Sequence, residues 1–173
     1  MNLLHDIVPG TKEEMNVIIE IPKGSHNKYE IDKKTGVIKL DRVLHSAQDY
    51  PFDYGFVPQT HWDDGDALDV VVLTTYPLAP GILVEARPIG IMHMIDSGEP
   101  DEKVIAVAVG DPRYAHVQDI KDANPHLLKE IAHFFATYKQ IQKKEVAVGE
   151  FEGRAEAEAA FDRARELYEA KKK

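Results

Sequence analysis

The 173-residue sequence contains no cysteine. This absence excludes disulfide bonds, thiolate ligands for zinc or iron–sulfur clusters, and a cysteine nucleophile. No apolar run approaches the roughly 18 residues that predict a membrane span, and the N-terminal segment lacks the basic and apolar regions of a signal peptide. We therefore expect a cytoplasmic protein that does not enter a membrane.

Basic residues are scarce relative to acidic ones, with 21 Lys and Arg against 30 Asp and Glu. Nearly all of the acidic excess lies in residues 63–111, which hold 10 acidic and 2 basic side chains. A nucleic-acid-binding protein would instead gather Lys and Arg on one surface, so nucleic acid is not an expected partner. The concentrated carboxylates either form a solvated acidic face or bind cations.

Short β-branched or alternating runs predict strands in the first two thirds of the chain. They cover residues 17–21, 28–32, 37–43, 70–74, 82–95 (as one or two strands) and 103–109, with a further strand at 145–148. Residues 28–43 are expected to form a hairpin, in whose second strand Ile38, Leu40 and Arg42 share a face. An arginine on an apolar face needs an anionic partner. Residues 49–59 are expected to form a loop, because Pro and Gly interrupt them.

Two helices are predicted in the last third of the chain. Asn124 and Pro125 are a typical helix start, and apolar residues spaced by three and four form one stripe from Leu127 to Ile141. A second helix is expected over residues 155–170, and the following lysines, 171–173, suit the negative end of its dipole. The pattern predicts a single α+β domain over residues 1–173, with a curled antiparallel sheet or small barrel and helices outside it.

The segment 63–69 is the densest chemical feature, because four carboxylates fall within seven residues directly before an apolar strand. It is not an EF-hand loop, since the positions that need glycine and glutamate hold Asp69 and Thr75. Ligands that are all oxygen favour Mg²⁺ or Mn²⁺. A second acidic segment, residues 95–103, also follows a predicted strand, so the two segments are candidates for one site with several metal ions.

A set of short motifs runs in order through about residues 15–142. The motifs are Glu20-Ile21-Pro22, Asn27 to Glu30, Leu40-Asp41-Arg42, Tyr50 to Gly55 with Pro58, Asp64 to Asp69, Ala86 to Gly90, Met94 to Asp96 with Asp101 and Lys103, and His133 to Lys139. This ordered set resembles the soluble inorganic pyrophosphatases of family I, of the prokaryotic type. Ala67 and Ser97 depart from the usual motif, and neither departure removes a principal ligand.

The resemblance implies a five-stranded OB-like barrel with helices packed outside it. It implies hydrolysis of pyrophosphate to two phosphates with roughly three to four divalent ions, usually Mg²⁺. Mn²⁺ or another divalent ion is an alternative. It also implies a homo-oligomer, with a hexamer favoured because prokaryotic relatives are commonly hexamers.

The same resemblance assigns roles to individual residues. It implies that Asp64, Asp69, Asp96 and Asp101 ligate metal, and that Asp66 accepts a proton from the attacking water. It implies outer metal contacts through water for Glu20 and Glu30. Phosphate contacts are implied for Lys28, Arg42, Tyr54, Lys103, Tyr138 and Lys139. General physics supports these roles, because a strongly anionic substrate needs cations around it and a guanidinium matches phosphate in a bidentate way.

Structural alternatives exist for several of these residues. Glu20 can be a solvated edge-strand residue, Tyr54 and Tyr138 can serve packing alone, and Lys139 can be solvated. Three rival functions are weaker. The acidic middle segment disfavours an oligonucleotide-binding module, and the broken EF-hand spacing disfavours a calcium-binding structural domain. A nucleotide pyrophosphohydrolase is disfavoured because the sequence lacks a GxxxxGK[ST] loop.

Overall fold

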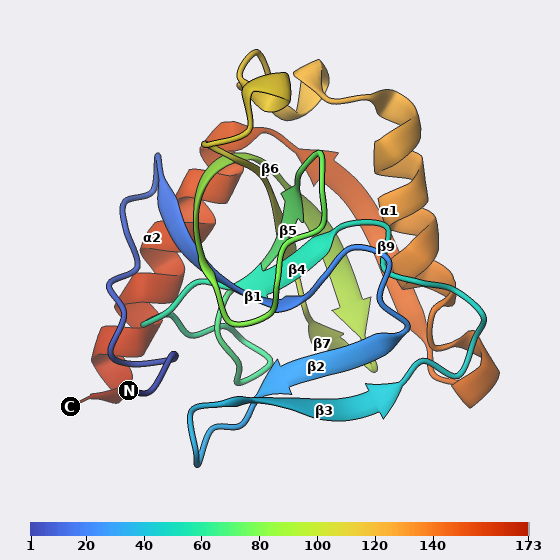
Figure 1. The fold of residues 1–173 in the computed structure, drawn as a ribbon, viewed down its shortest axis with the longest axis horizontal. Coiled ribbons are helices and arrows are strands. Elements are labelled where there is room, and N and C mark those ends of the chain that lie inside the picture. Colours follow the sequence, from blue (N-terminus) through green and yellow to red (C-terminus); the bar gives the residue numbers. More distant parts are fainter. Residues whose placement is uncertain (173) are drawn as a thin grey trace.

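The computed structural model describes residues 1–172, so Lys173 of the predicted basic tail lies outside the described residues. The strands are β1 (Met15–Ile21), β2 (Asn27–Ile31), β3 (Ile38–Val43), β4 (Asp53–Phe56), β5 (Asp69–Leu73), β6 (Leu83–Asp96), β7 (Glu99–Pro100), β8 (Lys103–Ala108) and β9 (Val146–Glu152). The helices are α1 (Pro125–Thr137) and α2 (Arg154–Lys171), and short 3-10 turns lie before α1 at Pro112–Tyr114 and Ile120–Asp122 and after it at Gln140–Gln142. The predicted α+β class is confirmed (Figure 1). Among residues 1–172, no helix is both long and apolar enough to cross a membrane.

Five strands of the described chain close into a ring. Strand β1 pairs with β4, β4 with β5, β5 with β8, β8 with β6, and β6 again with β1. The β5–β8 pair is parallel, and Val70 lies opposite Val104. This register places the beginnings of β5 and β8 side by side, at Asp69 and Lys103. The β2–β3 hairpin forms a separate two-stranded sheet beside the ring (Figure 1).

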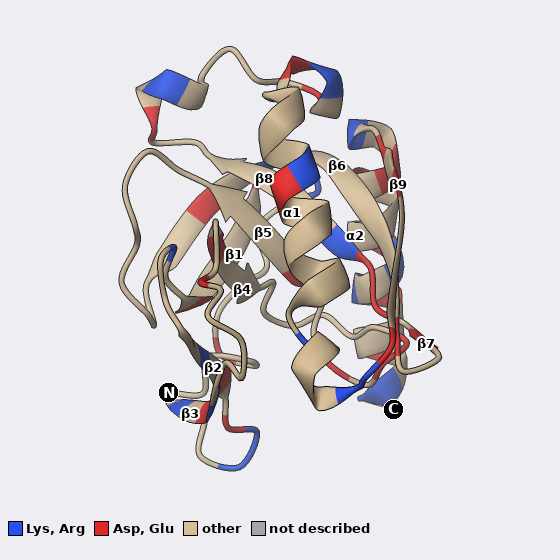
Figure 2. Ribbon diagram, turned by 90° about the vertical axis from the view of Figure 1, so that its right-hand side faces the viewer, with Lys and Arg blue, Asp and Glu red and all other residues tan. Residues whose placement is uncertain are grey.

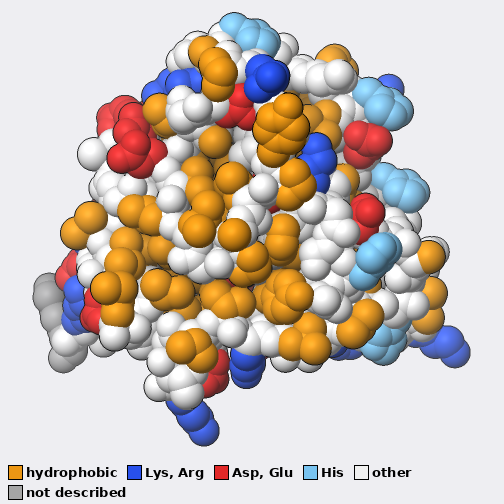
Figure 3. All heavy atoms as spheres, viewed as in Figure 1, with side chains coloured by type: hydrophobic (Ala, Val, Ile, Leu, Met, Phe, Trp, Pro, Cys, Tyr) orange, Lys and Arg blue, Asp and Glu red, His pale blue; other side chains and the backbone are white. Residues whose placement is uncertain are grey.

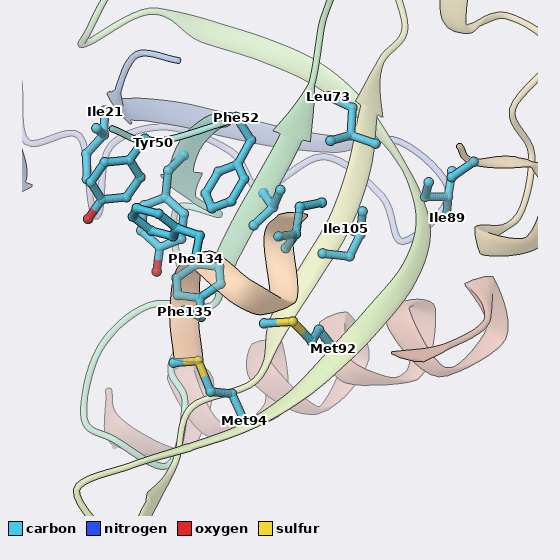
Figure 4. Close-up of a cluster of buried hydrophobic side chains, with 14 of the residues drawn as sticks. Ile21, Tyr50, Phe52, Leu73, Ile89, Met92, Met94, Ile105, Phe134 and Phe135 are labelled. Atoms are coloured by element: carbon cyan, nitrogen blue, oxygen red, sulfur yellow. The ribbon is translucent and has the colours of Figure 1, made fainter. Parts of the chain in front are cut away.

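The core lies on both faces of β5 and β8, which explains why these strands are apolar without alternation. Val71 and Ile105 belong to the cluster that packs against α1, whereas Val70 and Val104 belong to the cluster that packs against α2. Figure 4 shows the α1 side, where aromatic rings from α1 and from the segment before β4 pack together. Each fully buried aliphatic side chain stabilises the fold by about 1.5–3 kcal/mol. The beginnings of β5 and β8 are therefore held by a rigid core.

The prediction of a loop over residues 49–59 is wrong at its centre, where β4 forms. Gly55 is required there, because a Cβ atom at this position would lie 2.0 Å from the carbonyl oxygen of Ile18 in β1. The glycine permits close pairing of two backbones and does not break the strand. Pro51 and Pro58 stand outside β4 and bound it.

The apolar stripe of α1 ends earlier than predicted. The helix ends at Thr137, and the backbone N–H of Tyr138 still donates to the carbonyl of Phe134. A 3-10 turn then redirects the chain, and Ile141 is 63% exposed instead of continuing the stripe. Tyr138 remains buried at the end of the stripe. For residues 82–95, the structure has one long strand, β6, with irregular register near Gly90 and His93.

Candidate active site

A pocket of about 630 Å³ lies where the β2–β3 hairpin faces the beginnings of β5 and β8 and the end of α1. Every residue for which the sequence predicts a site role lines this pocket, with the exception of Arg42. The charged positions on the ribbon in Figure 2 include acidic and basic residues on the hairpin. Segments far apart in the chain therefore converge on one polar pocket.

Three carboxylates gather at one end of the pocket. Asp64, Asp69 and Asp101 each offer an oxygen, and these atoms lie within 4.8 Å of one another. The turn between Asp64 and Asp66 requires a left-handed residue, and Gly65 supplies it with a φ of 90°. Asp69 begins β5 and Asp101 lies just before the neighbouring parallel strand β8. Three oxygen ligands at this spacing suit a hard divalent cation.

Lys103 forms hydrogen bonds with two of these three carboxylates. Its Nζ donates to Asp69 Oδ2 at 2.6 Å and also to Asp101. Tyr54 Oη donates to the same Asp69 oxygen at 2.6 Å. Burial lowers the pKa of Lys103, but the two carboxylates outweigh burial and hold its pKa above the usual range. The site therefore contains a buried permanent positive charge next to its acidic cluster.

Burial, and to a lesser degree their neighbours, raise the pKa values of several of these acidic groups. Burial raises the pKa of Asp101 to about 7, and the nearby Asp69 adds to this effect. Burial also raises the pKa of Asp64. Glu20 is 6% exposed, and burial together with the Asp69 carboxylate raises its pKa to about 8. Its Oε1 accepts the backbone N–H of Ile31 at 2.7 Å, which ties β1 to the hairpin.

The affinity of the metal-free protein for Mg²⁺ should rise about tenfold from about pH 6 to about pH 8. A carboxyl group with a raised pKa keeps its proton below that pKa, and the proton competes with the cation for the same oxygens. Deprotonation of Asp101, with a pKa of about 7, therefore frees a carboxylate that a cation can bind across this range. Calorimetric titration with Mg²⁺ over the range measures the effect. An affinity that does not change with pH would contradict it.

A second charged group lies between β6 and the end of α1. Asp96 forms an ion pair with Lys139 and accepts a hydrogen bond from Ser97 Oγ at 3.0 Å. Burial raises the pKa of Asp96, but Lys139 outweighs it and the net pKa is lowered. Burial raises the pKa of the adjacent Tyr138 above its usual value, and Asp96 adds to this. Asp96 lies in the pocket but outside the cluster of three carboxylates.

Asp41 accepts hydrogen bonds from two basic residues of the hairpin, and no role was predicted for it from the sequence. Asp41 Oδ2 accepts from Lys28 Nζ at 3.2 Å and from Arg42 Nη1 at 2.6 Å. Asp41 is thus the anionic partner that Arg42 was expected to need. Within residues 1–172, the buried Nε and Nη2 atoms of Arg42 have no partner. Glu30 contacts Lys28 at 3.2 Å from the other side.

The prediction that Arg42 shares an apolar face with Ile38 and Leu40 is wrong. Pairing between β2 and β3 shifts register where Lys28 lies opposite Arg42, which interrupts the alternation along β3. Leu40 is 54% exposed, while Arg42 is half-buried and lies outside the pocket lining.

Asp66 differs from its acidic neighbours. Its side chain is 55% exposed and forms an ion pair with Lys33 in the turn between β2 and β3. Sequence reasoning missed this partner, because nothing in a turn lysine indicates that the turn folds over the acidic segment. Among the described residues, Asp66 is not a member of the carboxylate cluster.

Clustered carboxylates can hold divalent cations, and buried lysine and tyrosine side chains can contact phosphate groups. Together they are typical of a metal-dependent hydrolase whose substrate carries phosphate groups. The family model of inorganic pyrophosphatase matches residues 17–169. The chain belongs to this family and hydrolyses pyrophosphate to phosphate, which confirms the resemblance and the function predicted from the sequence.

Relatives from plants and bacteria agree with this assignment. The chain is 50% identical to soluble inorganic pyrophosphatase 1 of Arabidopsis thaliana over 163 residues, which cover 94% of this chain and 77% of the relative. It is also 50% identical to soluble inorganic pyrophosphatase of Oryza sativa subsp. indica, over 95% of this chain and 77% of the relative. The crystal structure of inorganic pyrophosphatase from Thermus thermophilus matches with a TM-score of 0.94 and 45% identity, covering 98% and 99% of the two chains.

Proposed function

We propose that this pyrophosphatase works with Mg²⁺ held by Asp64, Asp69 and Asp101, with roughly three to four ions in the complete site. The observation that carries this proposal is the cluster of three carboxylates beside buried Lys103. Phosphate release from pyrophosphate, measured with and without Mg²⁺ and beside ATP, tests it. Equal release with and without Mg²⁺ would contradict the proposal, and Mn²⁺ in place of Mg²⁺ tests the choice of ion.

The remaining acidic residues extend the proposed cation site. Asp101 and Asp96 are assigned to ions that arrive with substrate, and Glu20 and Glu30 to outer contacts through water. Burial, followed by repulsion from Asp69, raises the pKa of Glu20 to about 8, and a cation nearby would relieve that repulsion. When bound, Mg²⁺ neutralises phosphate oxygens and lowers the pKa of water.

We assign the phosphate contacts to side chains whose protons are held in place. Burial raises the pKa of Tyr54 far above its usual value, so its hydroxyl remains a hydrogen-bond donor. Lys28, Lys103 and Lys139 supply positive charge, and Tyr138 supplies a second hydroxyl at the rim. Asp66 is assigned as the acceptor of a proton from the attacking water, at a carboxylate oxygen that must first leave Lys33.

Arg42→Lys should keep the fold and lower kcat/KM by about 10- to 100-fold, the cost of one charge-assisted hydrogen bond. The buried Nε and Nη2 atoms of Arg42 have no partner among residues 1–172, so they can donate to a phosphate if the hairpin shifts toward the pocket, and an ammonium cannot reproduce that pair of donors. Steady-state kinetics measure the loss. Arg113→Lys, which changes an arginine stacked on Tyr76 outside the pocket, is the control. Unchanged kcat and KM in Arg42→Lys would leave Arg42 a structural role only.

The finer architecture and assembly are also proposals. The closed ring of strands supports an OB-like barrel, with residues 1–173 acting as a single domain. Family resemblance favours a cytoplasmic homohexamer. Exposed hydrophobic residues such as Tyr76 and Leu83 support association, and Figure 3 shows hydrophobic side chains gathered over one face. Light scattering on a sizing column tests the assembly, and a monomer at working concentration would contradict it.

A further inference from the structure

A hydrogen bond behind the pocket joins the two segments that supply its carboxylates. The indole Nε1 of Trp62 donates to Glu102 Oε2 at 2.8 Å. Trp62 lies two residues before Asp64, and Glu102 stands between Asp101 and Lys103. Neither Trp62 nor Glu102 lines the pocket, so this bond lies outside the space assigned to cations and substrate.

Trp62 is firmly held in its place. Its side chain is 6% exposed and belongs to the hydrophobic cluster that contains Leu68 and residues of α2. The Arg163 guanidinium of α2 lies 4.6 Å from the ring centre, and its ion pair with Asp63 is exposed to solvent and contributes little. The Trp62 backbone N–H donates to the carbonyl of Asp66 at 2.7 Å. The backbone of Trp62 is therefore tied to the turn that carries Asp64 and Asp66.

Glu102 has one weaker contact, beyond hydrogen-bond distance, on its other side. Its Oε1 faces His93 Nδ1 at 3.7 Å, and His93 Nε2 contacts Glu152 at 2.8 Å. The Glu102 side chain is 19% exposed. Because Glu102 is the residue between Asp101 and Lys103, its hydrogen bond to Trp62 opposes a displacement of this backbone segment away from the turn that carries Asp64.

The carboxylates in front of this hydrogen bond repel one another when no cation is bound. Asp64, Asp69 and Asp101 each offer an oxygen within 4.8 Å of the others, and Asp64 and Asp101 lie on two separate segments. Repulsion favours a wider spacing, and a cation that had to draw the segments together would bind more weakly. A hydrogen bond that keeps the two segments at a constant spacing avoids this loss of cation affinity.

We infer that the Trp62–Glu102 hydrogen bond is a positioning brace that holds the Asp64 and Asp101 segments at the spacing a divalent cation needs. This inference rests on the cation site proposed above. Residues that orient metal ligands from outside typically contribute 10- to 100-fold to metal affinity. Trp62 is also the chain's one tryptophan, so its emission reports on the brace without competing signals.

Three variants separate the brace from charge and from packing. Glu102→Ala removes the acceptor and should weaken Mg²⁺ binding by about 10-fold. Glu102→Gln removes the charge but keeps an oxygen for the indole, so its affinity should stay within about threefold of the parent. Trp62→Phe keeps a ring but no donor and should match Glu102→Ala. Combining Trp62→Phe with Glu102→Ala should cost no more than either change alone. Glu152→Ala, a carboxylate that contacts His93 but not Trp62, is the matched control.

Calorimetric Mg²⁺ titration and Trp62 emission of the metal-free protein provide readouts besides activity. We expect Mg²⁺ to change the emission of the parent protein in a saturable way. In Glu102→Ala the same change should need about 10-fold more Mg²⁺, and kcat at saturating Mg²⁺ should recover. A folded Glu102→Ala protein with parental Mg²⁺ affinity overturns the brace, as does equal loss in Glu102→Gln and Glu102→Ala. If Asp69→Asn also leaves Mg²⁺ affinity unchanged, the proposed cation site itself fails, which distinguishes the two ideas.

Discussion

Asp69→Asn should weaken Mg²⁺ binding by about 100- to 1000-fold and remove most of the turnover. One charge at about 4 Å from a cation is worth about 4 kcal/mol near a protein surface, and the amide supplies no charge. Asp69 is also the shared acceptor of Lys103 and Tyr54, and a neutral amide oxygen in its place weakens both hydrogen bonds. Calorimetric titration with Mg²⁺ or Mn²⁺, followed by steady-state phosphate release, measures the two effects separately.

Asp63→Asn is the matched control for that change. Asp63 belongs to the same acidic segment, but its carboxylate contacts Arg163 and lies outside the pocket lining. Its replacement should leave metal affinity within about threefold of the parent, since exposed ion pairs contribute little. Unchanged metal affinity in Asp69→Asn would show that Asp69 is not a ligand. An equal loss of affinity in both variants would show that the total negative charge of the segment, and not Asp69 in particular, attracts the cation.

The convergence of the acidic segments could be predicted from the sequence because each precedes a buried strand. Asp69 begins β5 and Asp101 lies just before β8, so a rigid core fixes both positions. The sequence pattern does not reveal that β5 and β8 are parallel neighbours, which requires the long connection through β6. That pairing places the two segments next to each other. Motif resemblance supplied the remaining site residues, and nearly all of them line the pocket.

Features that depend on distant pairing were not predictable. The register shift opposite Arg42 and the contact between Lys33 and Asp66 arise from how the hairpin lies against the ring. The Trp62–Glu102 hydrogen bond joins residues 40 positions apart. Strand β4 was missed because glycine and proline usually end strands, whereas Gly55 is needed for close contact between backbones. The secondary-structure preferences of individual residues do not reveal such contacts between distant parts of the chain.

Asp66 provides the test that separates a proton acceptor from a metal ligand. Its carboxylate lies in the pocket but outside the cluster formed by Asp64, Asp69 and Asp101 in the described chain. An acceptor in that position can be lost without loss of cation affinity. Its ion pair with Lys33 is largely exposed, so breaking it should cost little stability.

Asp66→Asn should therefore bind Mg²⁺ nearly as the parent does while its turnover falls by about 10²- to 10⁴-fold, the usual contribution of a positioned acid–base group. Activity should recover in part at alkaline pH, because hydroxide then forms without a side chain to accept the proton. Metal affinity and the pH–rate profile of the variant, measured together, decide the role. Lys33→Met is the companion control, since it frees Asp66 from its partner but keeps the carboxylate, and it should retain most of the turnover. Lost metal affinity in Asp66→Asn would make Asp66 a ligand, and unchanged turnover would make it a bystander at the rim of the pocket.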